Sequence, residues 1–104
     1  MKKKIFLSKS NKCHESFADE LKNLLKKEHD VYQYNELSIN KCDYLIIIPE
    51  CKENFYVGKG VYTAIEEFKD KDNIFVAINL FNFYKLTSYE IENEHDWSNY
   101  ATID

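Results

Sequence analysis

The run Tyr44-Leu45-Ile46-Ile47-Ile48, which Pro49 ends, is the stretch that decides the fold. Consecutive apolar residues without polar alternation indicate a strand that is covered on both faces, and parallel sheets require such strands. Proline ends the run because it has no N–H to donate to a sheet. The rest of the chain should therefore supply neighbouring strands and a layer for each face.

Three other segments are rich in strand-forming residues, at positions 4–8, 30–34 and 74–78. Two amphipathic helices alternate with these strands. The first is predicted to begin near residues 10–14 and the second near residues 58–60. Their apolar stripes are formed by Phe17, Leu21, Leu24 and Leu25 in the first helix and by Val57, Val61, Ala64, Ile65 and Phe68 in the second.

The order of these elements predicts a small α/β fold of flavodoxin-like layers, with a mainly parallel sheet of four or five strands. A helix is also expected between the second and third strands, but residues 35–43 leave room for barely two turns. Further on, residues 80–84 suit a strand or an aromatic flap, residues 89–92 an edge strand and residues 96–101 one helical turn. We expect residues 1–104 to form a single domain.

Charge and hydropathy exclude several classes of function. All 14 basic residues are lysine, and the formal net charge is −4. Residues 1–60 carry a net charge of +2 and residues 61–104 one of −6, so the C-terminal part would repel a phosphate backbone and nucleic-acid binding is not expected. No apolar run approaches the roughly 20 residues needed to cross a bilayer, and none suits a signal peptide. These features predict a cytoplasmic protein without membrane contact.

The cysteines and histidines form no pattern typical of disulfide or metal sites. The three cysteines, Cys13, Cys42 and Cys51, are odd in number and irregular in spacing, and the sequence has no CxxC or HxxxH pair. Cys42 is interpreted as a small buried residue beside a strand. We therefore predict neither a disulfide framework nor a bound metal.

Three loops are expected to meet at one edge of the sheet, because ligands of open parallel sheets bind beyond the carboxyl ends of the strands. These loops are residues 8–12, 49–60 and 79–83. The first two lead into helix N-termini, whose free N–H groups attract anions. Gly58 and Gly60 would let a ligand approach the backbone closely.

The second helix carries two neighbouring glutamates, Glu66 and Glu67. With Val61 as the zero of angle, Glu66 lies at about 140° and Tyr62 at about 100°, on one flank of the apolar stripe. Glu67 lies at about 240°, close to Thr63, on the outer side. Spacing predicts that Glu66 and Tyr62 border a cleft and that Glu67 is solvated, although both glutamates are also consistent with ordinary surface charges.

Three motifs resemble those of TIR domains and nucleoside 2-deoxyribosyltransferases. The strand Ile5-Phe6-Leu7-Ser8, with the polar loop and helix after it, looks like the opening of TIR domains. Cys42-Asp43 and the apolar run that follows resemble a strand of both families. Gly60 with Thr63-Ala64-Ile65-Glu66 resembles the transferases' Gly-Thr-Ala-apolar-Glu helix, although two residues separate the glycine from the threonine here. The resemblance covers about residues 4–78.

The resemblance implies a site and a chemistry. In those families the helix glutamate acts at the ribose, so Glu66 becomes the candidate catalytic residue. A fixed carboxylate stabilises the positive charge that builds on a sugar when its N-glycosidic bond breaks. The implied ligand-binding residues are Ser8, Ser10 and Asn11 on one wall and Gly58, Gly60, Tyr62 and Thr63 on the other. Tyr62 or an aromatic among residues 81–84 would stack on a base. No cofactor is implied, since NAD would be a substrate.

Three functions are compatible with these features. The first is a domain that binds a nucleotide or nucleoside and cleaves or transfers its N-glycosidic bond. The second is a non-catalytic module that binds or sequesters a nucleotide signal. The third is an interaction domain that self-associates as a homo-oligomer, as many TIR domains do. Loss of turnover in Glu66→Ala would separate the first from the second.

Overall fold

The computed structural model describes residues 2–9, 15–34, 36–48, 59–77 and 79–87, and of residues 59–62 it describes the backbone alone. The elements follow in the order β1 (Lys4–Lys9), α1 (Glu15–Lys26), β2 (Asp30–Tyr32), the 3-10 turn η1 (Ile39–Lys41), β3 (Tyr44–Ile48), α2 (Lys59–Glu67), the 3-10 turn η2 (Lys71–Asn73), β4 (Ile74–Ala77) and β5 (Phe83–Lys85).

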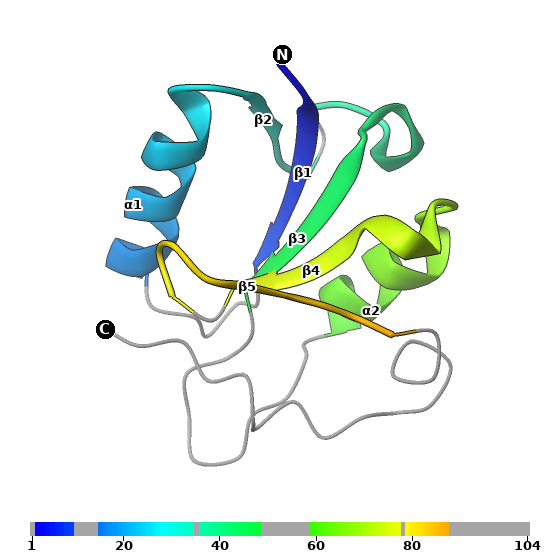
Figure 1. Ribbon diagram of the computed structural model, residues 1–104. Coiled ribbons are helices and arrows are strands. Elements are labelled where there is room, and N and C mark those ends of the chain that lie inside the picture. Colours follow the sequence, from blue (N-terminus) through cyan, green and yellow to red (C-terminus); the bar gives the residue numbers. More distant parts are fainter. Residues whose placement is uncertain (1, 10–14, 35, 49–58, 78, 88–104) are drawn as a thin grey trace.

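The five strands form one sheet in the order β2-β1-β3-β4-β5 (Figure 1). The first four strands are parallel, and β5 runs antiparallel to β4. β3 lies at the centre, where Leu45 pairs with Phe6 of β1 and with Ile74 of β4. The predicted mainly parallel α/β fold is therefore confirmed, with the strand order of flavodoxin-like folds and a reversed last strand.

The sheet separates two apolar clusters, because successive side chains of a strand point to opposite faces. α2 and η1 cover one face, here called the α2 face, and α1 covers the other, the α1 face (Figure 1). On the α2 face the strands contribute Phe6, Leu45, Ile47, Ile74 and Val76. On the α1 face they contribute Ile5, Leu7, Val31, Ile46, Ile48 and Ala77. Burial on both faces explains why the central strands lack polar alternation.

The α1 helix buries the predicted stripe. Phe17 and Leu21 are buried, one turn apart, and Leu25 is partly buried in the same cluster. Glu15 lies in the first turn and Lys26 in the last, where each charge interacts favourably with the helix dipole. The predicted start of this helix, residues 10–14, lies outside the described residues.

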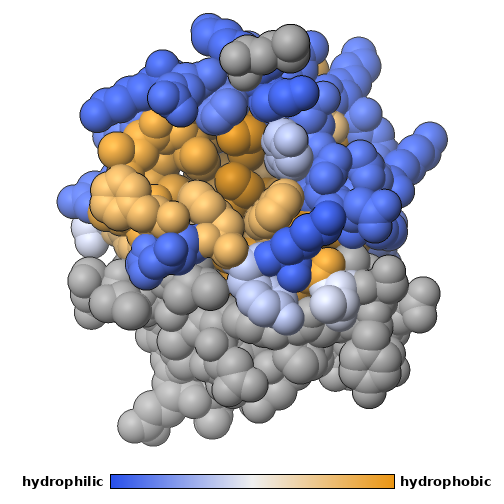
Figure 2. All heavy atoms as spheres, viewed as in Figure 1, coloured by the Kyte–Doolittle hydropathy of each residue, from blue (hydrophilic) through white to orange (hydrophobic). Residues whose placement is uncertain are grey.

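The α1 face is only partly covered by described residues. Figure 2 shows apolar atoms at the surface between α1 and the turn that joins β4 to β5. Tyr44, Phe75 and Leu80 are partly buried against the cluster of the α1 face, and the rings of Tyr44 and Phe75 meet edge to face with centroids 5.9 Å apart. Phe81 in the turn is exposed. The turn itself is closed by Asn79, whose side-chain oxygen accepts hydrogen bonds from two backbone N–H groups.

Three sequence expectations need adjustment. β2 was predicted over residues 30–34 but ends at Tyr32. In the described part of the link from β2 to β3, the helical element is the single turn η1. β5 occupies residues 83–85, which overlap only the end of the stretch expected to form a strand or a flap, residues 80–84. The elements expected at residues 89–92 and 96–101 lie outside the described residues.

Asp43, at the start of the apolar run, joins the beginnings of β1 and β3. Its carboxylate accepts a hydrogen bond of 2.8 Å from the N–H of Lys4, and its own N–H donates to the Lys4 carbonyl at 2.7 Å. These bonds set the register in which Ile5 lies beside Tyr44. The aspartate of this motif is therefore explained by strand alignment.

No helix in the described part of the chain has the length and apolar character needed to cross a membrane.

Candidate functional site

A cavity of about 1060 Å³ opens on the α2 face, between α2 and the segment that links β2 to β3. It exists because a single turn, η1, occupies a position where a longer crossover helix would cover β1 and β2. The cavity is lined by Phe6, Leu7, Ser8, Lys9, Gln33, Tyr34, Glu36, Leu37, Ser38, Ile39, Asn40, Thr63, Ala64 and Glu67. Its place beside the carboxyl ends of β1 and β2 is the usual one for a ligand site in this class of fold.

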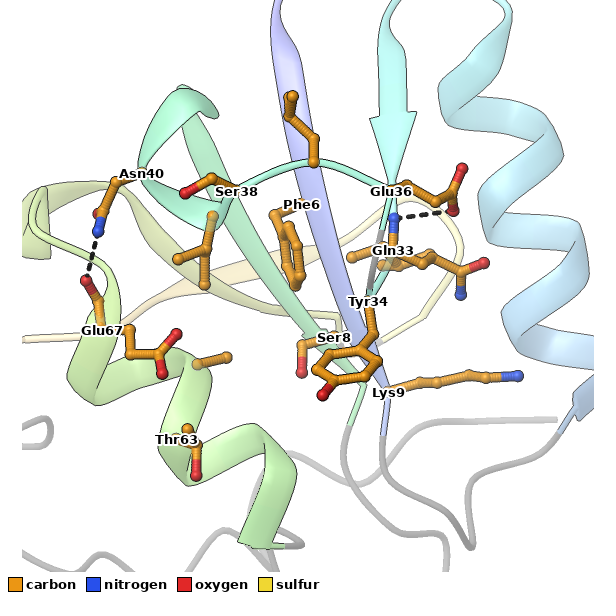
Figure 3. A pocket seen from close by; sticks show the side chains of 14 residues that line it. Phe6, Ser8, Lys9, Gln33, Tyr34, Glu36, Ser38, Asn40, Thr63 and Glu67 are labelled. Atoms are coloured by element: carbon orange, nitrogen blue, oxygen red, sulfur yellow. Dashed lines mark hydrogen bonds between the residues drawn. The ribbon is translucent and has the colours of Figure 1, made fainter.

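The cavity has an apolar floor and polar walls. Phe6, Ile39 and Ala64 are buried members of the core that reach the cavity. Figure 3 shows Phe6 and Ser8 between two walls, with Thr63 and Glu67 on one side and Tyr34 on the other. An apolar base with a few convergent polar groups is the common composition of small-molecule sites.

The charges of the lining favour neutral or cationic groups. The described lining contains two carboxylates, Glu36 and Glu67, and one lysine, Lys9. Lys9 is itself 2.7 Å from the carboxylate of Glu15 in α1. The described lining therefore offers no uncommitted cation for a phosphate group.

Asn40 ties the two walls of the cavity together. Its side-chain amide donates to the Glu67 carbonyl at 2.9 Å (Figure 3), and its side-chain oxygen accepts from the N–H of Lys69 at 2.8 Å. The Glu67 carbonyl is one of the last four of α2, which lack a partner within the helix, and Lys69 lies two residues beyond the end of α2. Asn40 therefore caps α2 and holds the segment after β2 against it.

Lys71 also caps the C-terminal end of α2. Its ammonium donates to the carbonyls of Ile65 and Glu66. Burial lowers the pKa of Lys71, while the nearby Glu66 carboxylate acts in the opposite direction. The side chains of Asn40 and Lys71 together stabilise the last turn of α2.

The opposite wall is a tight turn. The N–H of Glu36 donates to the Gln33 carbonyl at 3.0 Å, and the Glu36 carboxylate accepts from the N–H of Gln33 at 3.0 Å. Lys22 of α1 donates to the Gln33 side chain at 2.7 Å. The turn is thereby anchored to α1 and presents Tyr34 at the cavity.

The structure brings together part of the predicted site. Ser8 and Thr63 line the cavity. Glu66 is exposed and is not among the described residues of the lining. For Gly60 and Tyr62 the structure describes the backbone of α2 alone. Ser10, Asn11 and Gly58 lie outside the described residues.

Glu67, which spacing placed in solvent, reaches the cavity in place of Glu66. On the helical wheel, Glu67 at about 240° lies as far from the middle of the stripe as Tyr62 at about 100° does on the other side, so the side assigned above as the outer one is a second flank. The cavity lies along that flank. A helical wheel shows two flanks but cannot tell which one borders open space.

The segment between β2 and β3 was not expected to contribute to a site. It supplies half of the lining, from Gln33 to Asn40. The signal that pointed to it was the short gap before β3, which left too little chain for a covering helix. Residues 79–83, expected at the site, are not among the described lining residues, because their turn packs toward the α1 face through Leu80.

Cys42 is a core residue. It is buried in the cluster of the α2 face, which confirms its interpretation as a small buried side chain. Burial raises the pKa of its thiol, and the adjacent Asp43 carboxylate adds to this effect. Among the described residues, no group of three or more histidine, cysteine, aspartate or glutamate side chains is placed to hold a metal ion.

The described residues thus form a small α/β fold with a ligand-sized cavity beside the carboxyl ends of β1 and β2. Comparisons with protein-family models, with curated proteins and with solved structures find no significant match. The resemblance to TIR domains and deoxyribosyltransferases therefore stays a prediction from the sequence motifs.

Proposed function

We propose that the protein binds a nucleoside in this cavity and cleaves or transfers its N-glycosidic bond, with Glu67 as the carboxylate that acts at the sugar. The observation that carries the proposal is the placement of Glu67 at the rim of an apolar cavity, on the helix that the sequence motifs single out. Thr63 lies one turn earlier on the same wall, and Ser8 lies near the carboxyl end of β1.

The chemistry suits these groups. When the bond between the anomeric carbon and the base nitrogen breaks, the electron pair leaves with the base and positive charge builds on the sugar. A carboxylate held nearby stabilises that charge. Water or the nitrogen of a second base then bonds to the anomeric carbon, and the proton that it loses balances the one gained by the departing base. Thr63 and Ser8 supply hydroxyl groups to bind the sugar hydroxyls.

The sequence motifs favour Glu66 for this role, and the cavity favours Glu67. The two residues are adjacent, both exposed, and both on α2, so each is a matched control for the other. We propose Glu67 because a group must reach the bound sugar to act on it.

The test follows free base by mass spectrometry after incubation with nucleosides and deoxynucleosides, with NAD as the phosphate-bearing comparison. We expect release by wild type and by Glu66→Gln, and a loss of 100-fold or more in Glu67→Gln, on the order found for removal of a group that stabilises transition-state charge. Loss in Glu66→Gln alone would return the role to Glu66 and overturn the geometric assignment.

Binding without base release would place the protein in the second class, the non-catalytic binding module. Thermal shift with the same compounds detects this outcome. If no compound binds or reacts, while sedimentation shows concentration-dependent association, the interaction domain is the better description.

A further inference from the structure

Tyr34 has an unusual position for an aromatic side chain. Its relative exposure is 83%, and it belongs to the lining of the cavity. Among the described residues two other large apolar side chains are exposed, Phe81 at 78% and Phe83 at 37%, and neither lines the cavity. Of these three exposed rings, Tyr34 is therefore the one that lines the cavity.

The backbone around Tyr34 is anchored although the ring is not covered. Tyr34 follows Gln33, whose N–H and carbonyl both bond to Glu36, and whose side chain accepts from Lys22 of α1. The turn thus fixes the backbone position from which the Tyr34 side chain extends. Little conformational entropy is lost when a ligand fixes the two side-chain torsions of a tyrosine.

The surroundings of the ring suit a flat aromatic ligand. Figure 3 shows the Tyr34 ring beside Ser8 and Lys9, across the cavity from Thr63 and Glu67. A planar group laid on the ring would cover apolar surface that water now contacts, and it would leave the sugar on the side of the α2 wall. Stacking of a nucleic-acid base on an aromatic side chain tolerates any base but grows with the area of the base.

We propose that Tyr34 is the base-binding residue of the site and that the site prefers purines, whose two rings cover more of the tyrosine than one. This inference rests on the proposed function for the orientation of the ligand, with the base on Tyr34 and the sugar toward Glu67. The sequence motifs pointed instead to Tyr62 or to an aromatic among residues 81–84 as the stacking residue.

The test is a set of calorimetric titrations with adenosine, adenine, cytidine and ribose. Neutral probes are used because the described lining carries more carboxylates than lysines. The variants are Tyr34→Phe, which keeps the ring, and Tyr34→Leu, which removes it. Phe81→Leu is the matched control, since it also removes an exposed ring but at a position away from the cavity.

We expect adenosine and adenine to bind wild type, cytidine to bind several-fold more weakly, and ribose to bind weakest. Tyr34→Leu should weaken adenosine by about 10-fold or more, as expected for loss of one stacking contact, while Tyr34→Phe and Phe81→Leu should stay within about threefold of wild type. Thermal melting of all variants should coincide, because both positions are exposed.

Three results would overturn the inference: equal adenosine affinity in Tyr34→Leu and wild type, ribose binding as tight as adenosine, or no binding of either purine. Its failure is distinct from failure of the proposed function. Base release that does not depend on Tyr34 overturns the inference alone, whereas Tyr34-dependent adenine binding without base release overturns the proposed chemistry alone.

Discussion

Replacement of Asn40 by alanine tests whether one side chain holds the cavity together. The variant loses the hydrogen bond of 2.9 Å to the Glu67 carbonyl and the one of 2.8 Å from the Lys69 N–H. A hydrogen bond contributes about 0.5–1.5 kcal/mol net, and both bonds are exposed, so we expect the free energy of unfolding to fall by about 1–2 kcal/mol. That is a sizeable part of the roughly 5–15 kcal/mol of a typical domain.

The assay is urea unfolding followed by circular dichroism. With a denaturant slope of about 1–2 kcal/mol/M, the expected loss lowers the urea midpoint by about 1 M. Asn40→Asp should give an intermediate midpoint, because the carboxylate still accepts from the Lys69 N–H but no longer donates to Glu67. Asn23→Ala, at an exposed position on α1, should be neutral or slightly stabilising, since alanine is the better helix former.

An unchanged midpoint in Asn40→Ala would refute this reasoning. It would mean that water replaces both bonds at no cost and that the α2 wall is held by core packing alone. A loss well above 3 kcal/mol would refute it in the other direction, since two exposed hydrogen bonds cannot supply it.

Two further predictions concern the core. Phe68, which is 1% exposed, joins α2 to the sheet, so Phe68→Ala should lower the free energy of unfolding by about 3–5 kcal/mol in the same urea assay, and a loss below 1 kcal/mol would contradict the packing described. Because burial raises the pKa of Cys42, less of its thiol is ionised near pH 8 than in the unfolded chain. Iodoacetamide should therefore label Cys42 far faster in urea than in the native protein, as read by peptide mass spectrometry, and equal rates would show that the thiol is accessible.

Much of the fold was predictable because its signals are local. The apolar runs of β1, β3 and β4 need cover on both faces, and the 3.6-residue spacing of Phe17 and Leu21 defines the buried side of α1. Right-handed crossovers then leave few arrangements of parallel strands. β2 was harder to delimit, because a strand of three residues at the sheet edge carries little apolar pattern.

The candidate site was predictable only in part. Ser8 follows from the rule that ligands bind at the carboxyl ends of strands, and Thr63 follows from the resemblance of the helix motif; both line the cavity. Tyr34 and Asn40 belong to a polar segment without periodicity, which looks like an ordinary loop until its distance from α2 is known. The one signal in the sequence is the shortness of residues 35–43, which leaves too little chain for a covering helix.

The class of fold was thus predictable from the sequence itself, because the spacing of apolar residues indicates which side of each helix or strand is buried. The tertiary structure alone decided which flank of α2 borders the cavity, and so which of Glu66 and Glu67 reaches it. It also decided that Tyr34 faces Thr63 and Glu67 of that helix, which follow it by 29 and 33 residues in the sequence. The place of a residue in the apolar pattern of its helix or strand predicts whether its side chain is buried. Which residues of other elements it contacts depends on how the layers pack.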